Sequence, residues 1–136
     1  MQNGSAIAMS EIVRLGVTRR WSDVVIHQQT AYFVEVPDDP SADLRGQIQQ
    51  VFAQVDTRLQ AFGSDRTRLL QVVVYLPEAA DLGLFNSLWD DWIPEGHAPS
   101  RACLHTRLAA PAYRLELVIT AAVPLPASLP LPPGSS

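Results

Sequence analysis

The segment from Ser41 to Phe62 carries an apolar stripe at helical spacing, and this stripe limits the folds that the chain can adopt. Its apolar residues recur at steps of three and four, the period of one face of an α-helix. They are Leu44, Ile48, Val51, Phe52, Val55, Leu59 and Phe62. Pro40 and Ser41 predict the start of this helix, with Asp43 favourable in its first turn, and Gly63 predicts its end. A stripe of this length needs a sheet face or another helix to cover it.

Segments rich in β-branched and aromatic residues predict the strands of that sheet. Residues 24–26 and 30–36 form the first two, with Gln28-Gln29 as the turn between them. Residues 68–76 form the third, and 102–107 and 112–122 form the last pair.

A second helix is predicted between the third strand and the last pair. Asp81 is expected to cap it and Pro94 to end it. Its apolar face carries Leu82, Phe85, Trp89, Trp92 and Ile93. The order ββ-α-β-α-ββ predicts an α+β fold, in which one sheet carries both helices on one face.

The alternation of residues in the last predicted strand indicates how the two faces of the sheet differ. Alternation places one apolar set on the helix-covered face and a mixed set on the other. The apolar set is Tyr113, Leu115, Leu117 and Ile119, and the mixed set is Arg114, Glu116, Val118 and Thr120. A single domain in a chain of 136 residues has no third layer to cover the second face. We therefore expect a subunit partner there.

The chain is expected to hold one domain with two tails. Residues 1–10 predict a flexible extension, residues 11–123 the domain, and residues 124–136 a proline-rich, disordered end. No run approaches the ~20 apolar residues that span a bilayer, and no basic segment opens a secretory signal. We expect a cytoplasmic protein with no membrane partner.

Composition excludes several chemistries. All ten basic residues are arginine, which removes catalysis by a lysine Schiff base and the lysine of a P-loop. Cys103 is the only cysteine, and the three histidines show no metal-binding spacing, so we expect no metal and no cofactor. A formal net charge of −4 and a pI of about 5.2 argue against nucleic acid as a partner.

Several polar or aromatic residues stand where chemistry is possible. Arg101 enters a strand after Pro99, on one face with Cys103, and it suits either a carboxylate ligand or an ion pair. Glu116 lies in an otherwise apolar strand, so its carboxylate is expected to face water, a partner charge or a functional site. Cys103 fits a small core residue better than a nucleophile. Trp21 lies outside any helical stripe, so either a pocket wall or a surface position suits it.

These pieces together resemble one family over nearly the whole of residues 11–123. The segments are RWSDVVIH, TAYFVEVP, AFGSD, VVVYL, FNSLWDDWIPEGHAPSRAC and YRLELVITAAV. They are similar to the RidA (YjgF) family of enamine/imine deaminases. The most specific parts are Pro-x-Arg-x-Cys and a glutamate fifteen residues after its arginine. RWSDVVIH and the W-x-x-W-x-x-x-GHAP run are similar to a YoaB-like branch.

The resemblance implies a chorismate-mutase-like homotrimer with a central barrel and sites between subunits. It places the carboxylate-binding arginine on Arg101 and the water-positioning glutamate on Glu116. It places the other substrate-binding residues on Cys103, Trp21 and Asn86. The implied activity is cofactor-independent hydrolysis of 2-imino or enamine acids, such as 2-aminoacrylate, to 2-oxo acids and ammonia.

The chain departs from this family pattern at two places. Val34-Glu35 replaces the usual Ser/Thr-Gly, which puts bulk and negative charge beside an anionic substrate, and Trp21 replaces a tyrosine and its hydroxyl. These departures leave a second function open. The trimer would then bind a small carboxylate metabolite or a protein partner and regulate through it, without catalysis.

Overall fold

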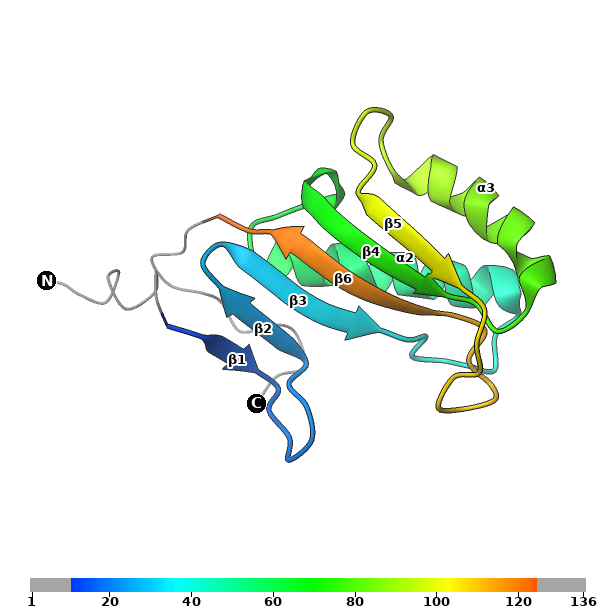
Figure 1. The fold of residues 1–136 in the computed structure, drawn as a ribbon, viewed down its shortest axis with the longest axis horizontal. Coiled ribbons are helices and arrows are strands. Elements are labelled where there is room, and N and C mark those ends of the chain that lie inside the picture. The colour runs from blue at the N-terminus through cyan, green and yellow to red at the C-terminus, as the bar shows by residue number, and fades with distance from the viewer. Residues whose placement is uncertain (1–10, 125–136) are drawn as a thin grey trace, which may run out of the picture.

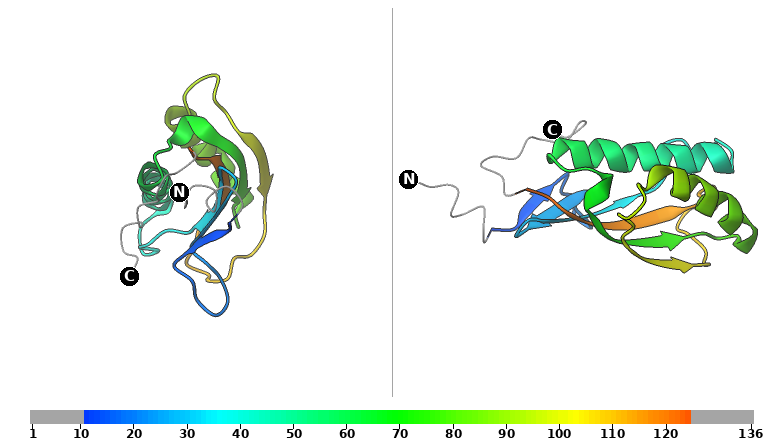
Figure 2. Two further views of the ribbon diagram at one scale, coloured as in Figure 1. Left: turned by 90° about the vertical axis from the view of Figure 1, so that its left-hand side faces the viewer. Right: turned by 90° about the horizontal axis from the view of Figure 1, so that it is seen from above.

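A computed structural model of the chain describes residues 11–124. In this part, six strands form one sheet and two α-helices lie together on one of its faces (Figures 1 and 2). The arrangement confirms the predicted α+β architecture. The expectations for the two tails concern residues that, apart from Pro124, lie outside the described part.

The sheet has the strand order β1-β2-β3-β6-β4-β5, so the last strand of the chain lies near its centre. Neighbouring strands are antiparallel except β4 and β5, which are parallel and joined through α3. The strands are β1 (Val13–Leu15), β2 (Val24–His27), β3 (Thr30–Glu35), β4 (Leu69–Tyr75), β5 (Ser100–Leu104) and β6 (Glu116–Ala122). The helices are α2 (Leu44–Ala61) and α3 (Leu82–Trp92), with single 3-10 turns η1 (Arg66–Arg68) and η2 (Ala79–Asp81). In residues 11–124 no helix is long and apolar enough to cross a bilayer.

The β2–β3 hairpin forms as predicted, with Gln28 and Gln29 at its turn. Both adopt left-handed backbone angles, with φ of 49° and 65°, as a two-residue hairpin turn of type I′ requires. The strand β1, which the sequence analysis does not predict, pairs with β2 from its other side. Its three residues are too few to show an alternating pattern.

Helix α2 begins at Leu44, three residues after the predicted start. The hydroxyl of Ser41 donates to Asp39 Oδ1 at 2.6 Å in a turn that precedes the helix. The N-cap is Asp43, whose Oδ1 accepts from the backbone N–H of Gly46 at 2.8 Å. Gly63 ends the helix as predicted, with a φ of 72° that favours glycine.

Helix α3 lies where the sequence predicts it, but the expected cap by the Asp81 side chain is wrong. That carboxylate accepts no hydrogen bond from the start of the helix. It is buried instead against Arg114, whose Nη2 donates to Asp81 Oδ2 at 3.0 Å. A charged guanidinium is a stronger donor than a backbone N–H, which explains the choice of partner.

The last two strands are shorter than predicted, and they are not neighbours. β5 covers Ser100–Leu104 in place of 102–107, and β6 covers Glu116–Ala122 in place of 112–122. The buried Gln47 of α2 binds the intervening backbone, since its Nε2 donates to Ala112 O at 3.0 Å and its Oε1 accepts from Arg114 N at 2.8 Å. The Gln47 amide therefore occupies the carbonyl of Ala112 and the N–H of Arg114, which a longer β6 would need for pairing with a neighbouring strand.

The two faces of the sheet differ as the alternation predicts. Leu115, Leu117 and Ile119 are at most 1% exposed under the helices. Between the helices, the rings of Phe52 and Trp92 stack with centroids 4.1 Å apart. On the other face, large apolar residues are 44–49% exposed, and no described element covers them. They include Tyr32, Val34 and Leu104.

Candidate functional site

Arg101 lies on the edge strand β5, on the face that the helices cover. Its register partner on β4 is Val72, which is fully buried on that face. The guanidinium carbon lies 5.1 Å from the centroid of the Trp89 ring and 5.8 Å from that of Phe85, both on α3. Such distances are typical of cation–π contacts, which orient the group. Within residues 11–124 the guanidinium makes no ion pair and no hydrogen bond.

Two more predicted residues belong to the same edge of the molecule. Cys103 follows Arg101 by two positions on β5, faces the same way and packs half-buried against the core. Asn86 lies on α3 between Phe85 and Trp89. Its Oδ1 is buried and accepts no hydrogen bond from the described residues. A buried carbonyl without a donor costs free energy, so this oxygen suits a donor from a ligand or a water.

Glu116 lies at the start of β6, on the opposite face of the sheet from Arg101. Its register partner is Tyr75, which in turn pairs with the exposed Leu104. Burial raises the pKa of the Glu116 carboxyl above its ordinary value. No hydrogen bond or ion pair to it is found among residues 11–124. Within one chain, therefore, Glu116 and Arg101 do not face each other.

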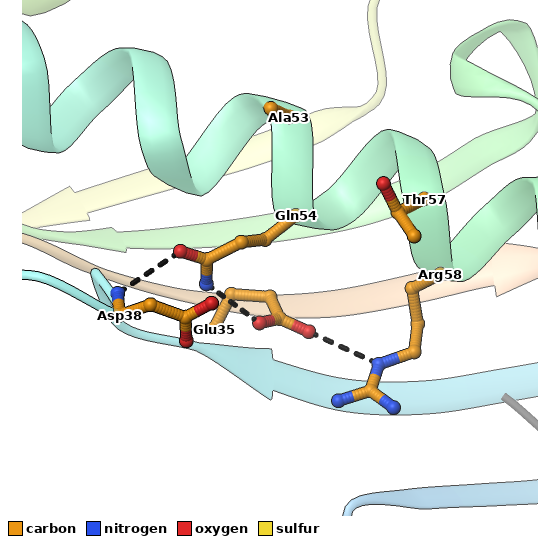
Figure 3. A pocket seen from close by; sticks show the side chains of 6 residues that line it. All are labelled: Glu35, Asp38, Ala53, Gln54, Thr57 and Arg58. Carbon is orange, nitrogen blue, oxygen red and sulfur yellow. Dashed lines mark hydrogen bonds and ion pairs between the residues drawn. The ribbon is translucent and has the colours of Figure 1, made fainter. Parts of the chain in front are cut away.

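Glu35 points between the sheet and α2, where its charge is matched. Gln54 Nε2 donates to Glu35 Oε1 at 3.0 Å, and Arg58 Nε donates to Oε2 at 3.2 Å (Figure 3). Burial raises the pKa of Glu35 in spite of these two contacts, which act in the opposite direction. The side chain is only 8% exposed. Its bulk and charge are thus turned into the layer under α2 and away from the uncovered face.

Trp21 lies in the loop between β1 and β2, near the sheet edge opposite to β5. The hydroxyl of Thr18 accepts from the Trp21 N–H and donates to the Trp21 carbonyl, both at 3.1 Å, which shapes the loop. The indole is 62% exposed. It lines a pocket of about 530 Å³ together with Tyr32, Val34 and Arg58.

The predicted site residues therefore lie in separate parts of one sheet. One group is Arg101, Cys103 and Asn86 at the β5–α3 edge, and the other is Trp21 and Glu35 on the β2–β3 side, with Glu116 between them on the uncovered face. The sequence analysis did not single out Gln54 and Arg58. Their spacing of four residues on α2 was the available signal, because it places both on one helix face. No group of three or more possible metal-binding side chains is found in the described residues.

Comparison with known proteins gives consistent matches over most of the chain. Residues 11–123 match the family model described as endoribonuclease L-PSP. A RutC family protein of Haemophilus ducreyi is 42% identical over 113 residues, which cover 82% of this chain and 97% of that protein. The RutC family protein YoaB of Escherichia coli K12 is 39% identical over 112 residues, which cover 82% and 98%.

Solved structures give the same result for the fold. The crystal structure of an uncharacterized protein from Pseudomonas aeruginosa matches with a TM-score of 0.80 and 38% identity, covering 84% of this chain and 100% of that one. A member of the YjgF protein family from Neisseria meningitidis matches with a TM-score of 0.75 and 34% identity, covering 84% and 96%.

Proposed function

The chain belongs to the RidA (YjgF) family, which the endoribonuclease L-PSP model describes, close to its YoaB-like branch, and we propose that it hydrolyses short-lived 2-imino or enamine acids to 2-oxo acids and ammonia. The observation that carries this proposal is the state of Arg101. Its guanidinium is held by two aromatic rings, yet no carboxylate of residues 11–124 pairs with it. An oriented guanidinium of this kind suits the carboxylate of an incoming acid.

In the proposed reaction, Arg101 binds the substrate carboxylate and thereby fixes the position of the adjacent imine carbon. Glu116 accepts a proton from a water, whose oxygen attacks that carbon and opens the C=N double bond. The proton then passes to the nitrogen, the C–N bond breaks, and ammonia leaves while the new hydroxyl gives its proton to Glu116, so that the 2-oxo group forms. A raised pKa suits Glu116 to this work, since a base is most effective when its pKa lies near the operating pH.

We further propose that the complete site forms between subunits of a homotrimer. This follows from the separation of the two residue groups, since one chain does not place Arg101, Trp21 and Glu116 around one cavity. The exposed Tyr32, Val34 and Leu104 on the uncovered face support an interface there. The family resemblance implies such an assembly, with these faces turned toward a central barrel.

The test of the activity is the release of 2-oxo acid from 2-aminoacrylate generated enzymatically in the assay. We expect the protein to accelerate release, and Arg101→Ala to lower kcat/KM by about 100-fold through the loss of a charged, bidentate contact. Arg45→Ala is the matched control, because Arg45 is an exposed residue of α2 and should leave the rate unchanged. Equal rates for the wild type and Arg101→Ala would refute the assigned role.

A second function, binding without catalysis, is supported by one observation. The carboxylate anchor Arg101 is already oriented within a single chain, whereas the base Glu116 lies on the other face. A regulator needs only the anchor. A 2-oxo acid such as 2-oxobutyrate should protect the protein against thermal unfolding under either function, but only an enzyme should accelerate ammonia release.

We do not propose RNA cleavage for this chain, although the family model is described as an endoribonuclease. A formal net charge of −4 leaves no general attraction for a phosphate backbone. We expect no retention on immobilised RNA at physiological salt, and clear retention would reverse this judgement.

A further inference from the structure

Gln54 on α2 makes three hydrogen bonds to the segment of chain that leaves β3. Its Nε2 donates to Glu35 Oε1 at 3.0 Å, and its Oε1 accepts from the backbone N–H of Asp38 at 3.0 Å (Figure 3). The same Nε2 donates to the carbonyl of Val36 at 2.8 Å. A residue of a neighbouring parallel strand bonds in this way to the carbonyl before and the N–H after the residue that it faces. The Gln54 amide therefore takes the place of a strand neighbour opposite Pro37.

The end of β3 lacks a strand neighbour on one of its two sides. The β2–β3 ladder ends at the pair Val24–Phe33. Beyond this pair, Val34 and Glu35 are paired with β6 alone. The end of a strand that is held from one side only opens more readily than its middle. The contacts of Gln54 hold this end of β3 from the helix layer.

Gln50, one turn earlier on α2, makes a similar contact farther from β3. Its Oε1 accepts from the backbone N–H of Asp39 at 2.9 Å, and its Nε2 donates to the carbonyl of the same residue at 3.0 Å. Both glutamines therefore bind the backbone between β3 and α2 through the same chemical group. Only Gln54 reaches Glu35 and Val36, so a comparison of the two isolates the effect on β3.

The position of Val34 connects these contacts with the proposed assembly. Val34 precedes the inward-facing Glu35, so its side chain points to the uncovered face of the sheet. That face is the one that we assign to the subunit interface. A strand end that is mobile in the free subunit has to be ordered on assembly, and each residue that is ordered costs conformational entropy.

We propose that Gln54 is a positioning residue for the site between subunits, because its bonds to Glu35 and Val36 fix the end of β3 in the conformation that the partner subunit binds. Gln54 acts through β3 and not by contact with the substrate, since it lies on the face that the helices cover. The proposal rests on the homotrimer proposed above, but it does not require the hydrolytic activity.

The exchange of subunits between trimers measures this effect directly. Unlabelled and heavy-isotope-labelled protein are mixed, and native mass spectrometry follows the appearance of mixed trimers. Gln54→Met preserves the approximate length of the side chain and removes all three hydrogen bonds. We expect its trimers to exchange subunits about tenfold faster than those of the wild type, because a weakened interface mainly raises the dissociation rate. Gln50→Met, the matched control, should exchange at close to the wild-type rate.

A pair of substitutions at positions 35 and 54 provides a test by rescue. Gln54→Glu places a second carboxylate beside Glu35, and the repulsion should accelerate exchange. Adding Glu35→Gln restores an amide donor opposite a carboxylate, and Arg58 can then pair with the new carboxylate four residues before it on α2. The double variant should therefore exchange more slowly than Gln54→Glu alone. A residue that only stabilises the fold would make the two changes additive.

The outcomes separate this proposal from the proposed activity. Equal exchange rates for Gln54→Met and Gln50→Met would overturn the role of Gln54, as would a monomeric wild type. Circular dichroism shows whether each variant is folded, and if Gln54→Met is not, the rescue of Gln54→Glu by Glu35→Gln decides. A wild-type trimer that releases no 2-oxo acid, and whose variants exchange as expected, supports the role of Gln54 and refutes only the hydrolytic function.

Discussion

The guanidinium of Arg101 lies over the Trp89 ring, with its central carbon 5.1 Å from the ring centroid, and Phe85 lies at 5.8 Å. An arginine side chain has several rotatable bonds, and ordering them costs conformational entropy during ligand binding. In this molecule the rings of α3 already restrict the Arg101 side chain before a ligand binds, so less entropy is lost on binding. The aromatic residues of α3 are therefore positioning residues for the proposed anchor as well as part of the core.

Trp89→Leu is expected to raise KM for the imino acid by about 2- to 5-fold, as a lost cation–π contact of roughly 0.5–1 kcal/mol implies. It should change kcat less. Trp92→Leu is the matched control, because Trp92 stacks on Phe52 and does not contact Arg101. Steady-state kinetics of both variants, with folding checked by circular dichroism, test the prediction. A KM that rises equally in both would show a general packing effect.

Arg58→Met is expected to lower the free energy of unfolding by about 2 kcal/mol at pH 8, because it leaves the buried Glu35 carboxylate without its cation. Burial already raises the pKa of Glu35, and loss of Arg58 raises it further. As the pH falls through that raised pKa, the folded protein binds a proton at Glu35 and the penalty shrinks.

Urea unfolding at pH 5 and pH 8 measures this dependence. The deficit of Arg58→Met relative to the wild type should be smaller at pH 5. Arg45→Met, an exposed change on the same helix, should show little deficit at either pH. A deficit for Arg58→Met that grows on acidification would contradict the assigned state of Glu35.

Glu116 should set the acid limb of the pH–rate profile. Its carboxyl must be ionised to accept a proton from water, and burial raises its pKa above 4.5. We therefore expect kcat/KM to fall on acidification with an apparent pKa above that value. Glu116→Gln should lower the rate by about 10²- to 10⁴-fold and abolish this limb. An unchanged profile in Glu116→Gln would assign the base to another group.

Val34→Asp should convert the proposed trimer to monomers and abolish activity with it. Val34 is 49% exposed on the uncovered face, and a carboxylate buried there in an interface loses its hydration, which costs free energy. Gln49→Asp, on the exposed side of α2, is the control for added charge. Light scattering at micromolar concentration reports the mass. A monomeric wild type would refute both the trimer and the site between subunits.

Features set by neighbouring residues could be predicted from the sequence. The stripe of α2, the Gln28-Gln29 turn and the alternation of Leu115, Leu117 and Ile119 all depend on local period or turn chemistry, and the structure confirms them. The family resemblance is likewise confirmed by the family match.

Features that depend on distant residues could not be predicted in this way. Arg114 takes Asp81 away from its expected cap across 33 positions, and Arg58 meets Glu35 across 23. Gln47 binds the backbone near Arg114 across 67 positions and shortens the last strand. No pattern of neighbouring residues in the sequence indicates these long-range contacts. The roles of Arg101, Glu116, Cys103, Asn86 and Trp21 stay predictions, because they concern a ligand and a second subunit.

The central position of β6 in the sheet has a consequence for folding during synthesis on the ribosome. β6 pairs with β3 on one side and β4 on the other, yet it is the last of the described strands to be synthesised. Until residue 122 has left the exit tunnel, those two strands each expose an edge that another nascent chain can join. The sheet of this domain therefore cannot be completed before β6 has left the tunnel, and a chain that ends before β6 would expose two unpaired strand edges and be prone to aggregate.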